Sequence, residues 1–372
     1  MPADVVIIGG GLIGCTIALE LARKGVAVTL VERVRLCTEA TWASAGMLAP
    51  QIEIDSRNDF FDFCYRGLEL YPQYIEELRE LTGLDSSLRV EGALQVAFDE
   101  VELKKLAKCY RWQFEAGLPI EELSAEQLRE HEPGLSDEVL GGYLFPQELQ
   151  LDNRRLAEAV VAAAQKLGVN FVIGADVTEI LIDRNRGRLK AIGVRAGNDM
   201  ITAGVVINAA GCWSGGIRVE GAKTPKLIPV RGQMVALRTT VGRLRRIIHT
   251  GHTYLVPRLD GRIIVGTTFE YVGYDKRVTA EALQMLLARA IKTVPALAKS
   301  EVVEFWSGLR PATEDKRPLL GYHPEVDALI YATGHYRDGV LLAPITAKLI
   351  AALVVDGTED AVLRLYSPAR VL

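Results

Sequence analysis

The sequence has little cysteine, and its cysteines are arranged for neither disulfides nor metal binding. The five of them are odd in number, scattered and without CxxC spacing. They are Cys15, Cys37, Cys64, Cys109 and Cys212. The histidines lack metal-ligand spacing and an obvious serine or cysteine partner. We therefore expect reduced, mostly buried thiols, no metal ion and no hydrolytic triad.

An excess of charge, a long apolar run and a leader-like start are also missing. The 43 basic and 47 acidic residues leave a net charge of −4 without long runs of either sign, so no nucleic-acid partner is expected. The longest apolar stretch, residues 341–355, is interrupted by Pro344 and Lys348, so we expect no membrane span. Residues 1–4 carry no basic region or cleavage site, which predicts a soluble, cytoplasmic protein without a signal peptide.

The start of the chain has the pattern of a β-α-β unit. A length of 372 residues with 49% hydrophobic content allows a large core and favours two domains over one. Residues 4–8 alternate too little for a half-exposed strand, which indicates a fully buried strand of a parallel sheet. Residues 12–24 have helical spacing and end at Gly25, and residues 26–31 predict a second strand.

Helical patterns occupy much of the next part of the chain. Residues 34–50 show no periodicity, whereas residues 59–82 have the spacing of a long helix that Pro72 kinks or divides. A short α+β piece is expected up to about residue 147. Residues 153–167 then predict a helix capped at Asp152 or Asn153.

Strand patterns dominate the second half. We expect a turn at Asn185-Arg186-Gly187 and a buried strand at residues 205–209. Residues 227–268 contain strands of alternating pattern that are separated by turns, as in an antiparallel sheet. Residues 329–333 and 344–355 predict a strand and a helix around a glycine-rich loop, so the chain returns at its end to the pattern of its beginning.

The segment GGGLIG at residues 9–14 carries a dinucleotide fingerprint, in which Gly9, Gly11 and Gly14 satisfy G-x-G-x-x-G. These glycines allow, in order, a tight turn, close approach of a pyrophosphate, and packing of helix on strand. The helix N-terminus adds amide donors, and Glu32, ending the second strand, is placed to accept from ribose hydroxyls. This context favours a dinucleotide site over a purely steric turn, but it serves NAD and FAD alike.

Two more strands that run into glycine favour FAD. Residues 206–213 (VINAAGCW) and 331–339 (YATGHYRDG) lead from apolar strands into loops at Gly211 and Gly334. Taken singly, each is equally well explained as an ordinary strand-to-loop turn. Because FAD is long, distant loops at the carboxyl ends of strands must contact it, and three such loops fit one extended flavin.

In combination these motifs resemble the D-amino-acid oxidase superfamily of FAD-dependent oxidoreductases. They are GGGLIG with Glu32, SAGML at 44–48, TYLVPR at 253–258, GLRP at 308–311 and GHYRDGVLLAP at 334–344. Over nearly the whole chain the similarity is greatest to the glycine oxidases of thiamine biosynthesis, whereas D-amino-acid and sarcosine oxidases share only parts of this set. No cysteine lies in or just after residues 308–321, where sarcosine oxidases attach FAD, so the resemblance implies noncovalent FAD. It also suggests a homotetramer.

The resemblance implies an α/β fold of two discontinuous domains. A Rossmann-like FAD-binding domain is expected from residues 1–84, 148–219 and 312–372. An antiparallel-sheet α+β domain that binds the substrate is expected from residues 85–147 and 220–311.

The resemblance also implies site residues. FAD contacts near the fingerprint and the following loops are expected at Gly9, Gly11, Leu12, Ile13, Gly14, Glu32, Arg33, Ala40, Thr41, Ala45, Gly46, Met47, Val177 and Gly211. Contacts with the isoalloxazine and ribityl groups are expected at Gly334, His335, Tyr336, Arg337, Asp338, Gly339, Val340 and Leu341. Substrate contacts are expected at Arg310, Tyr254 and Arg337. Phe269 stands where some glycine oxidases carry methionine, which leaves the size of the substrate open, and His252 is a nearby polar residue.

Of the substrate residues, Arg310 has the strongest case. It lies in an apolar context where a buried guanidinium needs an anion, either in a structural salt bridge or in a bidentate clamp on a substrate carboxylate. The intact motif favours the clamp. By pattern alone Tyr254 is a core aromatic of an alternating strand, and the resemblance favours a hydroxyl that bonds the same carboxylate. The side chain of Arg337 can instead stabilise its own loop without contacting the ligand.

The expected reaction is oxidation of glycine or another small amine or D-amino acid, such as sarcosine or D-alanine. FAD takes a hydride from the α-carbon, so no acid or base from the protein is required. The imine hydrolyses to an α-keto acid and ammonia, or supplies the thiazole of thiamine, and oxygen becomes hydrogen peroxide. The alternatives are a dehydrogenase with another electron acceptor and a noncatalytic flavin-binding redox sensor.

Overall fold

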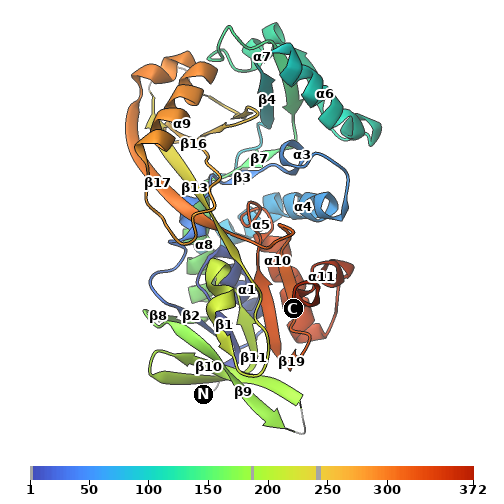
Figure 1. Cartoon of the computed structure of the whole chain (residues 1–372), viewed down its shortest axis with the longest axis vertical. Coiled ribbons are helices and arrows are strands. Elements are labelled where there is room, and N and C mark those ends of the chain that lie inside the picture. The colour runs from blue at the N-terminus through green and yellow to red at the C-terminus, as the bar shows by residue number, and fades with distance from the viewer. Residues whose placement is uncertain (1–2, 186–187, 240–243) are drawn as a thin grey trace.

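The computed structural model describes residues 3–185, 188–239 and 244–372 of the chain. Two sheets lie toward opposite ends of the long axis, with helices and short strands between them (Figure 1). Within these residues no helix combines the length and the apolar character needed to cross a membrane.

The larger sheet has ten strands and a parallel centre. The parallel strands run in the order β8 (Asn170–Ile173), β2 (Val28–Glu32), β1 (Ala3–Ile8), β11 (Asp199–Asn208) and β20 (Leu329–Thr333). The sheet is completed by β9 (Val177–Asn185), β10 (Arg188–Ala196), β12 (Arg218–Val219), β18 (Leu319–Tyr322) and β19 (Val326–Asp327). Because the central strands are parallel, their carboxyl ends meet at one edge, and that edge is where a ligand site is expected in such sheets.

Both faces of the parallel centre are covered, which explains why β1 is apolar from Val5 to Ile8, after the exposed Asp4. Ile7 packs in one core with side chains of α1 (Leu12–Arg23), α8 (Asn153–Lys166) and α10 (Ala343–Asp356). Its neighbours Val6 and Ile8 point to the other face and pack with side chains of β9, β10 and β12. Successive side chains of a strand alternate between faces, so a strand that is buried on both sides shows no polar alternation.

The second sheet has eight strands, mostly antiparallel. Their order is β17 (Glu301–Ala312), β13 (Ile228–Arg238), β16 (Arg262–Gly266), β15 (Tyr254–Pro257), β14 (Ile247–His249), β4 (Ala93–Ala97), β6 (Gly141–Phe145) and β5 (Glu121–Ser124). The helices α6 (Glu100–Glu115), α7 (Ala125–His131) and α9 (Ala280–Thr293) lie beside this sheet (Figure 1). The predicted α/β fold with an added antiparallel sheet is confirmed.

Several predicted elements differ in detail from the structure. Pro72 divides the predicted long helix into α4 (Asp59–Glu69) and α5 (Tyr71–Thr82), because proline fits the first turn of a helix but not its interior. Strands β13, β15 and β16 are buried along nearly their whole length, so their burial does not show the alternation expected for residues 227–268. Two residues of the predicted turn, 186 and 187, lie outside the described residues.

The stretch expected to be irregular contains short elements. They are α2 (Ala40–Ala43), β3 (Met47–Leu48) and α3 (Pro50–Glu53). Strand β3 pairs with β7 (Leu149–Gln150), so its conformation depends on a partner far along the chain and leaves no local periodicity. The chain closes with α11 (Ala361–Leu365), and short 3-10 helices occur at η1 (Gly211–Gly216), η2 (Pro295–Lys299) and η3 (Pro368–Arg370).

Candidate active site

A cavity of about 380 Å³ extends from the carboxyl ends of the parallel strands to the second sheet. Most residues predicted for the site line it: Gly9, Gly11, Leu12, Ile13, Glu32, Arg33, Ala40, Thr41, Ala45, Gly46, Met47, Val177, Gly211, Tyr254, Arg310, His335, Tyr336, Arg337, Asp338, Gly339, Val340 and Leu341. The cavity thus joins segments that are widely separated in the sequence. An elongated ligand that reaches from the glycine turn to β17 matches this shape.

The glycine turn at one end leaves room for a ligand at Gly11. A Cβ atom added to Gly11 would meet only the Thr41 hydroxyl oxygen, at 3.7 Å. By contrast, a Cβ on Gly14 would lie 2.0 Å from the Gly9 carbonyl oxygen, so Gly14 permits packing of α1 on β1 and does not line the cavity. Helix α1 begins beside this space, and Gly11 at its N-cap offers no side-chain cap. The Leu12 amide at this end donates to the Thr41 hydroxyl oxygen at 3.0 Å. The partial positive charge of the helix N-terminus still favours an anionic group such as a pyrophosphate.

Gly334 is the other predicted residue that does not line the cavity. It follows β20 with a φ of +76°, and an added Cβ would lie 3.0 Å from a methyl carbon of Thr313. Gly334 therefore allows the chain to turn from β20 into the loop, and the residues after it form the wall of the cavity.

The charged side chains of Glu32 and Arg33 lie at the carboxyl end of β2, beside the glycine turn. The Glu32 carboxylate accepts from the amides of Gly10 at 2.8 Å and Val34 at 3.0 Å. The Arg33 guanidinium lies 3.8 Å from the ring centroid of Trp213 and pairs with Glu39 at 3.3 Å. The open space at Gly11, the N-terminus of α1 beside it and the held Glu32 carboxylate fit the dinucleotide part of FAD.

Arg310 on β17 lies at the other end of the cavity and contacts neutral acceptors. Its Nη2 donates to the Thr267 hydroxyl oxygen at 2.7 Å, and its Nη1 donates to the Thr268 carbonyl oxygen at 3.2 Å. Within the described residues, no carboxylate forms an ion pair with Arg310. The surrounding protein desolvates the guanidinium and lowers its pKa, although part of the side chain stays accessible from the cavity. A largely desolvated arginine without a charged partner is suited to bind a carboxylate.

Two glycines make room for this arrangement. A Cβ on Gly232 of β13 would lie 2.3 Å from Nη2 of Arg310, and a Cβ on Gly266 would lie 2.4 Å from the ring of Tyr254. Neither glycine was predicted as a site residue. Their contribution arises from cross-strand neighbours, which no local motif identifies.

Tyr254 on β15 is held beside Arg310 by contacts that leave its hydroxyl weakly engaged. The hydroxyl lies 3.3 Å from the sulfur of Met234, and the ring stacks on His249 at 6.3 Å between centroids. Desolvation raises the pKa of Tyr254, so the hydroxyl remains a hydrogen-bond donor at neutral pH. The same effect lowers the pKa of His249 to about 4, so its imidazole is neutral.

Arg337 differs from Arg310 because a carboxylate already holds it. Its Nη2 lies 2.7 Å from Oε1 of Glu53, and this attraction raises the pKa of Arg337. Glu53 belongs to α3 and was not predicted, because its segment shows no sequence pattern. The structure thus brings both arginines predicted to contact the substrate to the cavity, and of these two only Arg310 has no charged partner in the described residues.

The loop after β20 supplies buried titratable groups. His335 Nε2 lies 3.1 Å from the Thr346 hydroxyl oxygen, and burial lowers the pKa of His335 to about 3. Burial, and next the nearby Glu53, raise the pKa of Asp338 to about 7. His335 is therefore neutral at physiological pH.

A second cavity, of about 620 Å³, adjoins the first at its Arg310 end. Both are lined by Tyr254, Thr267, Phe269 and Arg337. Phe269 is 49% exposed, and its ring lies 4.8 Å from the Arg310 guanidinium carbon. His252 lines the second cavity and not the first.

Comparison with known proteins agrees with this architecture. The family model described as FAD dependent oxidoreductase matches residues 4–353. The glycine oxidase of Geobacillus kaustophilus is 34% identical over 94% of this chain and 92% of its own. A crystal structure of the glycine oxidase from the same organism matches with a TM-score of 0.93 and 32% identity over 100% of this chain and 99% of the other.

A longer relative has a second part that this chain does not match. The bifunctional protein ThiO/ThiG of Synechocystis is 38% identical over 100% of this chain, but the match covers 54% of that protein. The chain thus spans about half the length of this bifunctional relative. The family match and the near-complete alignment with a glycine oxidase show that the chain belongs to the FAD dependent oxidoreductase family, within the group that contains the glycine oxidases.

Proposed function

We propose that this protein uses FAD to oxidise glycine and other small amines or D-amino acids, such as sarcosine and D-alanine. The products are the imine or α-keto acid, ammonia and hydrogen peroxide. The observation that carries this proposal is Arg310, a cation with two neutral acceptors and no carboxylate partner in the described residues. It lines the same cavity as the glycine turn, and relatives of similar length bear the name glycine oxidase.

The two ends of the cavity are proposed to bind different parts of FAD and the substrate. We assign the FAD phosphates to the turn at residues 9–14, the ribose to Glu32, and the flavin end to residues 334–341. Residues 1–84, 148–219 and 312–372 form the proposed FAD-binding domain, and residues 85–147 and 220–311 form the proposed substrate-binding domain. The two sheets support this division, since the strands of the larger sheet come from the first set and those of the smaller sheet mainly from the second.

The proposed substrate residues hold the carboxylate and restrict the space around it. Arg310 binds the carboxylate as a fork, and the Tyr254 hydroxyl donates to one of its oxygens. Phe269, Met234 and Tyr254 line the cavity near Arg310 and favour a small substituent on the α-carbon. When bound, FAD supplies the electron sink. The pKa values of His249 and His335, lowered by burial to about 4 and about 3, make both imidazoles weak bases, which supports a reaction without a base from the protein.

The bifunctional relatives support a use for the product. We propose that the imine is consumed in forming the thiazole of thiamine, because the matching region of these relatives is joined to a second unit named ThiG. A cytoplasmic location and a homotetramer remain predictions.

Peroxide release tests the proposed function directly. Purified yellow protein is incubated in air with glycine, sarcosine, D-alanine and D-proline, and peroxide and ammonia are measured. We expect both products from glycine in equal amounts. Dye reduction under nitrogen without peroxide in air would identify a dehydrogenase, and no turnover with any of these compounds would support a redox sensor.

FAD is expected to leave the protein on acid precipitation, with a yellow supernatant and a colourless pellet. Cys212 is the cysteine that lines the cavity, and burial raises its pKa to about 12. Its thiol is therefore protonated and a poor nucleophile at neutral pH. A yellow pellet would contradict noncovalent binding, and FMN or NAD in the supernatant would contradict the choice of cofactor.

A further inference from the structure

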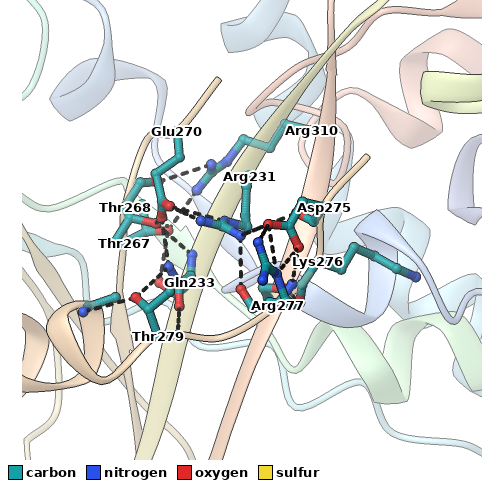
Figure 2. A network of polar contacts seen from close by, with 12 residues as sticks. Arg231, Gln233, Thr267, Thr268, Glu270, Asp275, Lys276, Arg277, Thr279 and Arg310 are labelled. Atoms are coloured by element: carbon teal, nitrogen blue, oxygen red, sulfur yellow. Dashed lines mark hydrogen bonds and ion pairs between the residues drawn. The ribbon is translucent and has the colours of Figure 1, made fainter. Parts of the chain in front are cut away.

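A network of charged and polar side chains includes Arg310 and the segment that contacts it (Figure 2). Its centre is Arg231 of β13, whose side chain is 6% exposed. Arg231 donates to Glu270 through Nε at 3.0 Å and through Nη2, and its Nη1 pairs with Asp275 at 3.1 Å. The backbones of Arg231 and Glu270 also pair in both directions, at 2.9 and 3.0 Å.

Glu270 connects this network to the segment that follows β16. Its Oε1 accepts from the Thr268 hydroxyl and from Nε2 of Gln233, the latter at 2.8 Å. The Thr268 hydroxyl oxygen in turn accepts a hydrogen bond from the backbone amide of Gln233 at 2.9 Å. Through these bonds β13 holds residues 267–270 in place. Burial alone would raise the pKa of Glu270, but the hydrogen bonds from Arg231, Thr268 and Gln233 lower it, so the group is a carboxylate at neutral pH.

The same segment supplies both acceptors that orient Arg310. They are the Thr267 hydroxyl oxygen and the Thr268 carbonyl oxygen, and the ring of Phe269 lies against the guanidinium. Neither acceptor carries a charge, so the direction of the guanidinium depends on where the segment is held. A displacement of a fraction of an ångström is enough to spoil a bidentate geometry.

We infer that Glu270 is a positioning residue for binding of the substrate carboxylate, because it fixes the segment that orients Arg310. The inference rests on the proposed function, since it assigns Arg310 to the carboxylate. Glu270 does not line the first cavity, where Arg310 lies, although it lines the adjoining second cavity. It therefore acts through Thr268 and Arg310 on a carboxylate bound in the first cavity, without touching that carboxylate.

The test compares Glu270→Gln with Asp275→Asn in the FAD-loaded enzyme. Both variants remove one negative charge from Arg231, but Asp275 makes no contact with residues 267–269 among the interactions described. We expect Glu270→Gln to raise the KM for glycine about tenfold, with a smaller change in kcat, and to weaken competitive inhibition by acetate to a similar extent. Asp275→Asn is expected to keep both constants within about twofold of the wild type. FAD content should be equal in all three proteins.

The possible outcomes separate this inference from the proposed function. Wild-type protein that does not oxidise glycine contradicts the proposed function. An active wild type with an unchanged KM in Glu270→Gln overturns the inference alone, and so does an equal rise in Asp275→Asn, which would indicate a structural effect of Arg231. If Glu270→Gln does not fold, Glu270→Asp keeps the charge but shortens the side chain, and a rise in KM without a matching fall in kcat is expected there too.

Discussion

Protein carrying Gly11→Val is expected to purify folded but colourless. Gly11 has φ −74° and ψ 176°, a backbone conformation that valine adopts, and its Cβ would meet only Thr41 at 3.7 Å. The chain therefore tolerates the substitution, whereas the valine methyl groups occupy the space assigned to the pyrophosphate. Circular dichroism should show a folded protein, and the absorbance of flavin after purification should be absent even when FAD is added.

The control replaces with valine a second glycine, Gly134, at which an added Cβ has similar space. A Cβ on Gly134 would also meet its nearest neighbour at 3.7 Å, and Gly134 does not line the cavity. Gly134→Val should keep its flavin. Folded and fully yellow Gly11→Val would show that the phosphates lie elsewhere.

Arg310→Ala is expected to lower kcat/KM for glycine by about 10- to 200-fold, mainly through KM, while FAD content stays unchanged. The range corresponds to about 1.5–3 kcal/mol for a hydrogen bond to a charged group. The loss should be large because Arg310 has no carboxylate partner in the described residues, so the substrate supplies its only anion. Steady-state kinetics with glycine and with an amine that lacks a carboxylate measure it, and the amine should be affected much less.

The second arginine of the cavity tests whether the effect is specific to Arg310. Replacing Arg337 alone would leave the Glu53 carboxylate unpaired near the substrate. The double variant Glu53→Gln with Arg337→Gln removes both charges and is expected to lower kcat/KM less than about tenfold. An equal loss with the amine and with glycine in Arg310→Ala, or unfolding of that variant, would make Arg310 structural. A larger loss in the double variant would place the carboxylate at Arg337.

The glycine-turn end of the cavity was predictable because its parts are close in sequence. The apolar strand, the spaced glycines, the helix and Glu32 all lie within the β-α-β unit at the start of the chain. The turn conformation and the helix period are local properties, so a short sequence determines them. Gly14 illustrates the point, since its predicted packing function matches a Cβ position only 2.0 Å from a backbone oxygen.

The surroundings of the predicted arginines were not predictable in this way. Arg310 and Arg337 both lie in motifs that resemble the family. The sequence indicated that Arg310 would bind an anion and that Arg337 would contact either the ligand or its own loop. Glu53, which separates their roles, lies 284 residues from Arg337 in a segment without periodicity. An ion pair between such distant residues leaves no repeating pattern in the sequence, so only the folded chain shows which arginine is already paired.

The sequence by itself therefore determined the β-α-β unit, the dinucleotide fingerprint and the motifs that resemble the FAD-dependent oxidases, because these depend on residues near one another. Only the tertiary structure decided that Arg310 faces neutral acceptors, that Arg337 is neutralised by Glu53, and that Glu270 holds the segment on which Arg310 rests. The physical reason is that charge pairing and desolvation depend on distances in space. Strand pairing brings together residues that are far apart along the chain, so their positions in the sequence do not reveal these distances.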